Sequence, residues 1–345
     1  IISLFTLTAA FSRPFSGKLT DLIGRKPIMI FGALIAFVSS LSYLILATVL
    51  GFMFLRLFHG LSTGFSPTGR TAFLSDVVPT AKRGEALGIL GVAGGLGMAG
   101  GPALGAEISM RFGLDAMFYA SAFLALISVI IVLPMKETLA NRRKFNLKMM
   151  KISFSDVFEP LVKGPAIVML LYTFSFGVIL TLIPDFSHYL NIANKGLYFT
   201  VYFLSSLFSR IIAGKVSDKY GRIIVLKTGL TIVILGLLST GLATDKFMFL
   251  LGAALYGFGG GIGSPTVFAW TVDLSDEKKR GRGISTMFLA MEIGIGIGAL
   301  VSGWVFDNKI ENLPRVFWIS AVLIFIAILY LQFFWRNYKV KPLRL

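Results

Sequence analysis

Cysteine is absent from this 345-residue sequence, and histidine occurs only twice. Without cysteine there is no disulfide, no thiolate nucleophile and no iron–sulfur ligand. Two histidines and no cluster of carboxylates leave neither a metal centre nor a hydrolase triad to assemble. We therefore expect no enzyme activity, no metal and no cofactor.

Charge is also scarce, since only 14% of the residues are Asp, Glu, Lys or Arg, against about 25% in soluble proteins. Hydrophobic residues make up 55%, and the mean hydropathy is +0.80. The polar residues are too few to cover the surface of a soluble protein. Most of the exterior is therefore expected to face lipid. Nearly all of the apolar segments are long enough to cross about 30 Å of hydrocarbon as helices. These segments are 1–16, 27–49, 51–75, 84–108, 115–134, 165–188, 197–214, 223–243, 247–273, 283–305 and 314–335.

The net charge of +16 is unevenly distributed along the chain. Of the 33 Lys and Arg residues, 24 lie in one alternating set of connections between the apolar segments, and five lie in the opposite set. This is the positive-inside pattern, so the basic connections are predicted to be cytoplasmic. Nucleic acid is excluded as a partner, because no single folded surface would be basic. We expect a multi-pass, monomeric protein of a bacterial cytoplasmic (inner) membrane.

One glycine-rich, charged turn occurs twice in the sequence. Residues 12–26 read SRPFSGKLTDLIGRK and residues 209–223 read SRIIAGKVSDKYGRI, with seven identities at a constant offset of 197. The same offset relates Asp76 to Asp273, and it relates the pair Arg83-Gly84 to the pair Arg280-Gly281. Matches spread over some 90 residues indicate a duplicated bundle, which is typical of a transporter built from two related halves.

The repeat also predicts an absent helix. The span at 165–188 precedes the second copy of the turn, and the counterpart of this span would precede residue 1. We therefore expect an all-α membrane protein whose first helix is missing from this chain, so that helices 2–12 of twelve are present. A natural eleven-helix protein is the alternative.

The domain boundaries follow from the same comparison. We expect an N-terminal bundle at 1–135 (helices 2–6) and a C-terminal bundle with a short basic tail at 165–345 (helices 7–12). The connection at 136–164 is basic and contains an amphipathic stretch from Phe145 to Val162. It is predicted to be a cytoplasmic loop with a helix lying on the membrane interface.

The repeated turn carries a resemblance to a known family. The stretch GKLTDLIGRK at 17–26 resembles the signature of the major facilitator superfamily, in the cytoplasmic loop between helices 2 and 3. The stretch GKVSDKYGRI at 214–223 is a second copy that lacks the final basic residue. The resemblance covers essentially the whole chain. It implies two six-helix bundles, related by pseudo-twofold symmetry, that rock around a shared pathway.

Charged residues of the doubled signature form two triads. Asp21 and Arg25 are four residues apart and can meet on one helical face, and Asp76 could then pair with Arg25. The resemblance implies that such a cluster latches the two halves in the outward-open state. The alternative is that the charges only cap helices and set topology. The triads are Asp21, Arg25 and Asp76, and Asp218, Arg222 and Asp273.

Three further polar residues lie within apolar spans. Arg56 is costly inside a bilayer and therefore a functional candidate, although it could instead snorkel to the outer interface. Arg56 and His59 resemble a helix-4 motif of the family that is linked to proton transfer, and His59 could equally be structural. Glu292 lies about 13 Å into its helix, at 1.5 Å per residue. A carboxylate there could exchange a proton or bind a cationic substrate.

A glycine pattern in the segment 84–108 bears on the direction of transport. It resembles the family's antiporter motif, with Ala106 in place of a final glycine, and glycines four apart form a groove for a neighbouring helix. We expect proton-coupled efflux of a small organic substrate, as in multidrug resistance. Uptake of a sugar or similar nutrient by proton symport or uniport is the alternative, and a non-transporting membrane sensor is a third possibility. The motif residues are Gly88, Gly97, Gly101, Pro102 and Gly105.

Overall fold

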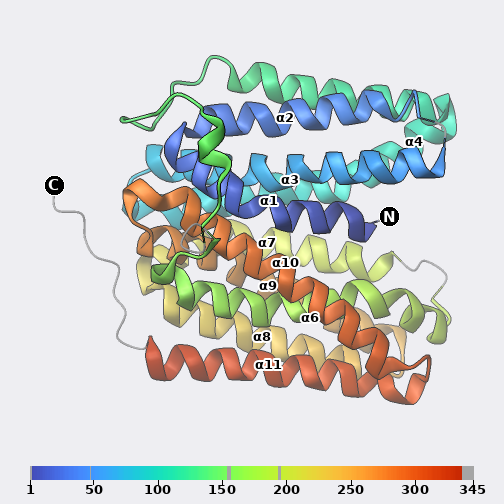
Figure 1. The fold of residues 1–345 in the computed structure, drawn as a ribbon. Helices are drawn as coiled ribbons and strands as arrows, with labels where there is room; N and C mark the ends of the chain where they lie inside the picture. Colours follow the sequence, from blue (N-terminus) through green and yellow to red (C-terminus); the bar gives the residue numbers. More distant parts are fainter. Residues whose placement is uncertain (1, 47, 154–156, 193–195, 336–345) are drawn as a thin grey trace. The chain divides into compact units, whose positions relative to one another are not determined.

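The computed structural model describes residues 2–46, 48–153, 157–192 and 196–335 (Figure 1). This part of the chain is helical and contains no β-strand. Its α-helices are α1 (Ile2–Leu22), α2 (Arg25–Ser42), α3 (Val49–Val77), α4 (Arg83–Val132), α6 (Lys163–Tyr189), α7 (Leu197–Tyr220), α8 (Arg222–Gly241), α9 (Lys246–Leu274), α10 (Arg280–Phe306) and α11 (Leu313–Phe334). Short 3₁₀ helices are η1 (Thr80–Lys82), η2 (Leu147–Met150), η3 (Pro160–Val162), η4 (Glu277–Lys279) and η5 (Ile310–Asn312).

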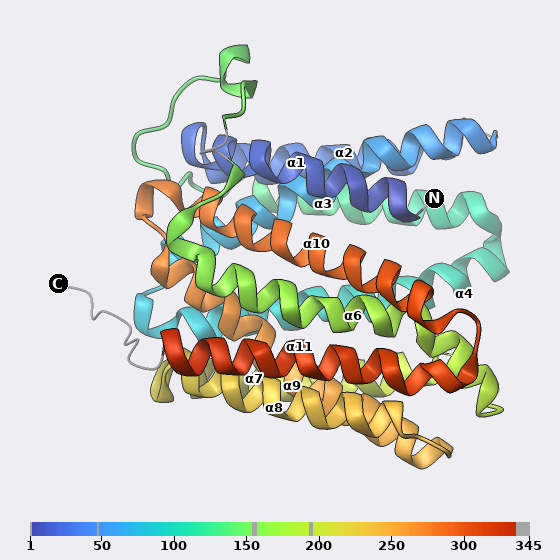
Figure 2. The same ribbon diagram turned by 60° about the horizontal axis from the view of Figure 1, so that its bottom comes forward.

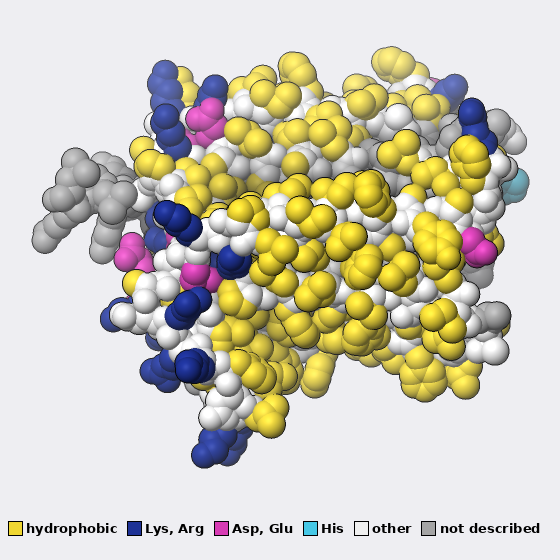
Figure 3. All heavy atoms as spheres, turned by 90° about the horizontal axis from the view of Figure 1, so that it is seen from above, with side chains coloured by type: hydrophobic (Ala, Val, Ile, Leu, Met, Phe, Trp, Pro, Cys, Tyr) yellow, Lys and Arg dark blue, Asp and Glu magenta, His cyan; other side chains and the backbone are white. Residues whose placement is uncertain are grey.

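The helices follow the apolar segments of the sequence. The expected spans 84–108 and 115–134 both lie in α4, and Gly113 breaks that helix between them with φ 87° and ψ 168°. Eight helical segments of the described chain are long and apolar enough to cross a membrane. On the face drawn in Figure 3, hydrophobic side chains predominate, and Lys and Arg side chains gather towards one end. The predicted all-α membrane fold is confirmed.

The repeated turn is very short in both copies. Gly24 separates α1 from α2 with φ 119°, and Gly221 separates α7 from α8 with φ 90°. A residue with a Cβ rarely adopts such a backbone conformation. The two glycines therefore let each helix pair reverse direction with only one or two residues between the helices, which brings the charges of the turn close together.

Clustering of contacts divides the chain into two compact units. The first comprises Ile1–Val78, Gly100–Val162 and Leu274–Leu289, and the second comprises Pro79–Ala99, Lys163–Asp273 and Ala290–Leu345. Each unit thus contains a short segment from the other half of the sequence. The start of α4 belongs to the second unit, and the start of α10 belongs to the first.

Within the first unit, α1 and α2 both pack against α3. Small residues bring the backbones together. A Cβ placed on Gly32 of α2 would lie 2.6 Å from the backbone nitrogen of Ser66 in α3, and one on Gly60 of α3 would overlap the carbonyl oxygen of Phe5 in α1. Such glycine contacts are the usual means of close helix packing in membranes.

Within the second unit, α11 packs against α8 and α6, and α11 and α8 lie side by side in Figures 1 and 2. Glycines again mark the close approaches. A Cβ on Gly177 of α6 would meet the backbone of Ile295 and Ala299 in α10, and one on Gly257 of α9 would meet the backbone of Tyr202 in α7. The glycine-rich stretches 257–263 and 294–298 therefore serve helix packing.

The connection between α4 and α6 differs from the expected amphipathic helix over Phe145 to Val162. Its described part contains the short 3₁₀ helices η2 and η3 and a helical residue at Val157, and the backbone at Lys151 is extended. Residues 154–156 of the expected helix lie outside the described residues.

Tertiary hydrogen bonds explain this departure. Lys18 Nζ donates to the carbonyl oxygen of Lys151 at 2.8 Å. The amide N–H of Glu159 donates to Thr286 Oγ1 at 3.0 Å. Backbone groups that a helix would have paired internally are bonded instead to α1 and α10. The apolar residues of the loop therefore contact the first unit locally and do not form a continuous helical face.

Candidate functional site

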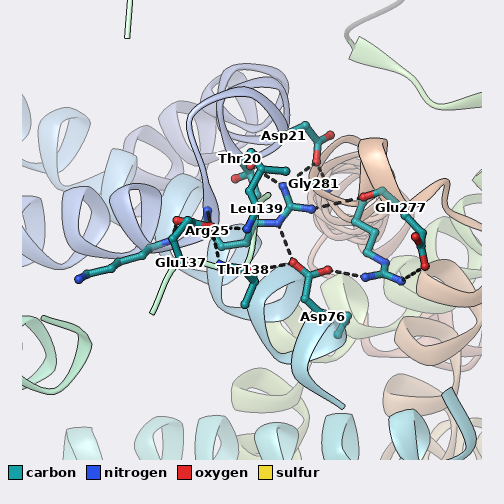
Figure 4. Close-up of polar contacts among 12 residues, drawn as sticks. Thr20, Asp21, Arg25, Asp76, Glu137, Thr138, Leu139, Glu277 and Gly281 are labelled. Atoms are coloured by element: carbon teal, nitrogen blue, oxygen red, sulfur yellow. Dashed lines mark hydrogen bonds and ion pairs between the residues drawn. The ribbon is translucent and has the colours of Figure 1, made fainter. Parts of the chain in front are cut away.

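The first triad assembles at the α1–α2 turn of the first unit (Figure 4). The carboxylate of Asp21 accepts the backbone N–H of Gly281 at 2.7 Å and that of Arg282 at 2.9 Å. These amides belong to the first turn of α10, whose N–H groups have no partner within the helix. Asp21 thus caps a helix that lies about 260 residues further along the chain, where its negative charge also complements the helix dipole.

Arg25 and Asp76 form the second part of this cluster. Arg25 Nε donates to Asp76 Oδ2 at 3.0 Å, and Arg25 Nη1 lies 3.5 Å from Asp21 Oδ1. The other oxygen of Asp76 pairs with Arg280. Arg25 is 1% exposed and Asp76 is 11% exposed. Asp76 therefore bridges two guanidinium groups, one from the turn and one from the start of α10, with little screening by solvent.

A carboxylate from the loop completes the cluster. Glu137 accepts the backbone N–H groups of Arg25 and Lys26, both at 3.0 Å, and so caps the first turn of α2. The neighbouring Thr138 hydroxyl donates to Asp76 Oδ2 at 2.7 Å. The loop therefore holds the turn on one side, while α10 contacts it on the other, as Figure 4 shows.

The second triad repeats this arrangement within the second unit. Asp218 accepts the backbone N–H of Gly84 and that of Glu85, both at 3.1 Å, at the start of α4. Arg222 Nε donates to Asp273 Oδ2 at 2.9 Å. Each of these contacts lies at an offset of 197 residues from its counterpart in the first cluster.

Arg83 corresponds to Arg280 by the same offset, and its Nη1 lies 3.5 Å from Asp273 Oδ1. Arg222 also pairs with Asp218. A Cβ on Gly84 would lie 2.6 Å from Asp218 Oδ1, and one on Gly281 would lie 2.7 Å from the carbonyl oxygen of Gly17. A glycine at the helix start is thus required for the close approach in both clusters.

The two clusters differ at the loop carboxylate. The position 197 residues after Glu137 is Phe334, which cannot accept a hydrogen bond. A Cβ on Gly24 would overlap Glu137, whereas a Cβ on Gly221 would meet no described atom within 4 Å. Within the part of the chain that the structure describes, the loop holds the first turn and no corresponding segment holds the second.

Arg56 and His59 lie together on α3, with Tyr43 between them. His59 Nδ1 is 3.3 Å from the Tyr43 hydroxyl. The Arg56 guanidinium lies over the rings of Tyr43 and Phe52, 5.5 Å and 5.1 Å from their centres. Contacts of this kind stabilise a cation at a partly buried position. The structure therefore places both residues in one aromatic group of the first unit.

Glu292 lies half-buried on α10, in the second unit. The same turn of α10 packs against α6, because Thr173 Oγ1 donates to the carbonyl oxygen of Met291 at 3.1 Å. A Cβ on Gly294 would meet Leu170 and Thr173. The backbone that carries Glu292 is therefore fixed against α6.

The family model described as Major Facilitator Superfamily matches residues 1–189 and 165–344. The chain belongs to the major facilitator superfamily. It is therefore a membrane transporter and not an enzyme, and it is a multi-pass protein of the cytoplasmic (inner) membrane.

Three proteins illustrate the range of this transporter's relatives. The multi-drug resistance efflux pump PmrA of Streptococcus pneumoniae is 29% identical over 314 residues, which cover 87% of this chain and 76% of PmrA. The human organic anion transporter MFSD10 superposes with a TM-score of 0.83 at 20% identity, over 96% of this chain and 82% of that chain. The proton:xylose symporter XylE superposes with a TM-score of 0.81 at 15% identity, over 96% and 84%. At these identities the two structures show the fold alone.

The antiporter-like glycines of the transporter differ in their surroundings. A Cβ on Gly88 would lie 3.1 Å from the carbonyl oxygen of Arg210 in α7, and one on Gly105 would lie 3.6 Å from Met117 Sδ. A Cβ placed on Gly97 or Gly101 would meet no described atom within 4 Å beyond the adjoining residues of its own helix. The side chain of Pro102 lies outside the described residues.

Sequence reasoning missed several members of the clusters. From the sequence alone, Arg83 and Arg280 have no assigned role and are identified only as parts of a repeated Arg-Gly pair. The signal for a role was that the sequence offset of 197 residues that relates the two triads also relates these two arginines. Glu137 was missed altogether. It is the only carboxylate of the basic stretch 136–151, and an isolated acid among cations is a signal for an internal partner.

Asp21 is expected to make the transporter's stability depend on pH. It lies five residues beyond the apolar stretch 1–16, and burial raises the pKa of its carboxyl from 3.8 to about 7, against the opposing effects of Arg25 and of the two amides. Between these two values the folded protein binds more protons than the unfolded chain, so stability rises as the pH falls from about 7 towards 4.

The wild type should therefore gain thermal stability relative to Asp21→Asn when the pH is lowered from about 8 to about 5. Thermal unfolding of both proteins in detergent measures this difference. Asp307→Asn, at a 65% exposed carboxylate, is the matched control. A difference that shrinks or stays constant over this range would contradict the assignment.

Proposed function

We propose that this transporter exports a small organic molecule in exchange for protons by alternating access, and that it does so as a monomer. The residues 1–135 and 165–345 would form its two moving bundles, joined by the cytoplasmic loop 136–164. Export is favoured by the likeness to PmrA, whose name describes an efflux pump, and by the antiporter-like glycine spacing.

The observation that carries this proposal is the pair of exchanged segments. Pro79–Ala99 groups with the second unit and Leu274–Leu289 groups with the first, and each segment contains a helix start that a carboxylate caps. Two symmetrical docking points of this kind can close one end of a pathway and release it again. This supports the role of the two triads as a latch for one conformational state.

The aromatic group around Arg56 and His59, together with Glu292, would supply proton coupling. Glu292 is the proposed carrier of the proton or of a cationic substrate, because a carboxylate within an apolar span has few other uses. Arg56 and His59 would assist from the first unit.

The direction of transport is tested in everted membrane vesicles that contain the full chain. An imposed acidic lumen should drive accumulation of a fluorescent organic dye such as ethidium, and addition of the dye should release protons from the lumen. Vesicles without the transporter are the control. Accumulation of the dye, or of a sugar, only when the lumen is alkaline would show proton symport and thus favour uptake instead of export.

A further inference from the structure

A groove opens on the outside of the second unit, along α7, α8 and α9. It has a volume of about 210 Å³ and an almost wholly apolar lining. Along α7 the lining residues run from Ser209 through Ile212 and Val216 to Tyr220, which is one face of the helix. Eleven steps of 1.5 Å from Ser209 to Tyr220 make this about 16 Å, close to half of a hydrocarbon core of about 30 Å. The groove thus extends over about the depth of one leaflet.

The same positions of the first unit are filled by the protein itself. Subtracting 197 from Ile212, Val216 and Ile262 gives Phe15, Leu19 and Phe65, and these three belong to a closed hydrophobic cluster. Thr228 corresponds to Phe31, whose ring packs 4.9 Å from that of Phe65. At these four positions, larger side chains occupy the space that the second unit leaves open, whereas Tyr220 and Phe258 correspond to the smaller Ile23 and Leu61.

A segment of the loop also covers the filled groove. Met149 packs against the cluster of the first unit, and Lys18 donates to the carbonyl oxygen of Lys151. The apolar side chain of Met149 and the carbonyl oxygen of Lys151 therefore cover the corresponding position of the first unit. In the second unit, Lys215 is the counterpart of Lys18, but no such segment lies among the described residues that line the open groove.

A lysine lies beside the cytoplasmic end of the groove, next to the lining residue Tyr220. Lys219 is exposed, and its Nζ lies 5.3 Å from the centre of the Tyr220 ring. Lys215, one turn earlier on the same helix, is already paired with Glu85, with its Nζ 3.3 Å from Glu85 Oε1. The positive-inside pattern puts this end in the cytoplasmic leaflet, where anionic lipids concentrate. The tail 336–345 carries four Lys and Arg residues and no acid. Its positive charge would be repelled by Lys219, so it is a poor occupant of the groove.

We infer that the groove binds one anionic phospholipid, with an acyl chain along Ile212, Val216 and Thr228 and the headgroup phosphate at Lys219. The lipid supports the α7–α8 turn at Gly221 as the loop residues Glu137 and Met149 support the α1–α2 turn at Gly24. This inference rests on the membrane location of the chain and is independent of what the transporter carries.

Native mass spectrometry of the full chain in detergent, with equal amounts of phosphatidylglycerol and phosphatidylcholine, tests this site. The wild type should retain phosphatidylglycerol about fivefold over phosphatidylcholine, as expected for one interfacial lysine. Lys219→Leu, which copies Leu22 of the first half, should lose that preference. Lys246→Leu, at a cation outside the groove, should keep it.

The groove itself is tested by the double variant Ile212→Phe with Thr228→Phe, which copies Phe15 and Phe31. It should retain neither lipid, while Ile211→Phe, at a 62% exposed position on the same helix, should behave as the wild type. Equal retention of both lipids by the wild type, or full retention of phosphatidylglycerol by the double variant, would overturn the proposal. If the double variant does not fold, Lys219→Leu still decides the outcome.

Two other occupants are separate outcomes of the same experiment. A chain that ends at Trp335 and binds several times more phosphatidylglycerol than the full chain would show that the tail fills the groove. A dimer that the double variant abolishes would show that a second copy fills it. Either result would overturn the lipid assignment.

Discussion

Replacing Arg25 by alanine is expected to destabilise the transporter by about 3–5 kcal/mol and to reduce transport to background, because the change leaves buried carboxylates without their cation. Asp76 would lose one of its two cations and retain Arg280 and the Thr138 hydroxyl, and Asp21 would lose its ion pair across the turn. Thermal unfolding and dye transport in vesicles measure the two effects. Lys279→Ala, at an exposed cation of η4, is the control and should change neither.

Two companion variants separate folding from switching. Arg25→Lys keeps the charge but not the planar set of donors that reaches Asp76 and Thr20 together, so it should restore stability in part. Arg25→Met with Asp76→Asn removes both charges and should lose less stability than Arg25→Ala, yet still fail to transport. Wild-type transport by Arg25→Ala would remove the cluster from the mechanism.

Replacing Glu292 by glutamine is expected to lower dye accumulation driven by a pH gradient tenfold or more, equivalent to at least ~1.4 kcal/mol of lost coupling. Glutamine has nearly the same shape but cannot take up a proton. Glu292→Asp should retain part of the activity. Glu311→Gln, at an exposed carboxylate of η5, is the matched control.

Exchange of labelled for unlabelled substrate, without any gradient, tells proton coupling from substrate binding. If Glu292 carries the proton, Glu292→Gln should still exchange substrate at the wild-type rate. If it binds a cationic substrate, exchange should fall together with accumulation. Undiminished accumulation in the variant would exclude both roles.

The sequence predicted the helices and the charged triads but not their main partners. Repetition of the turn identified Asp21 and Asp218, because identical charges at a constant offset are rare. The partners of Asp21 are backbone amides about 260 residues away, and every residue type has an amide. No side-chain pattern could therefore predict them. The i to i+4 contact of Asp21 with Arg25 was predictable. At 3.5 Å it is longer than the hydrogen bonds that Asp21 accepts from the amides of Gly281 and Arg282.

In the loop between α4 and α6, the sequence pattern predicted a helix that the described residues do not form. The stretch from Phe145 to Val162 has helical periodicity, yet its polar backbone groups find partners on α1 and α10. The periodicity of apolar residues indicates which face of a helix could be buried. It does not indicate whether the backbone groups would form hydrogen bonds with a neighbouring segment instead of within a helix. Met149 shows this, since its side chain packs against the cluster that contains Leu19 and Phe65 although it does not lie on a continuous helix.

The cap that Glu137 places on α2 determines where the loop tolerates added sequence. Only a few residues join the end of α4 at Val132 to Glu137, and they place the carboxylate on the amides of Arg25 and Lys26. Residues inserted before Leu139 would pull that cap away. A fluorescent reporter or an affinity tag fused within the chain therefore belongs between Leu139 and Arg143, where the side chains are exposed.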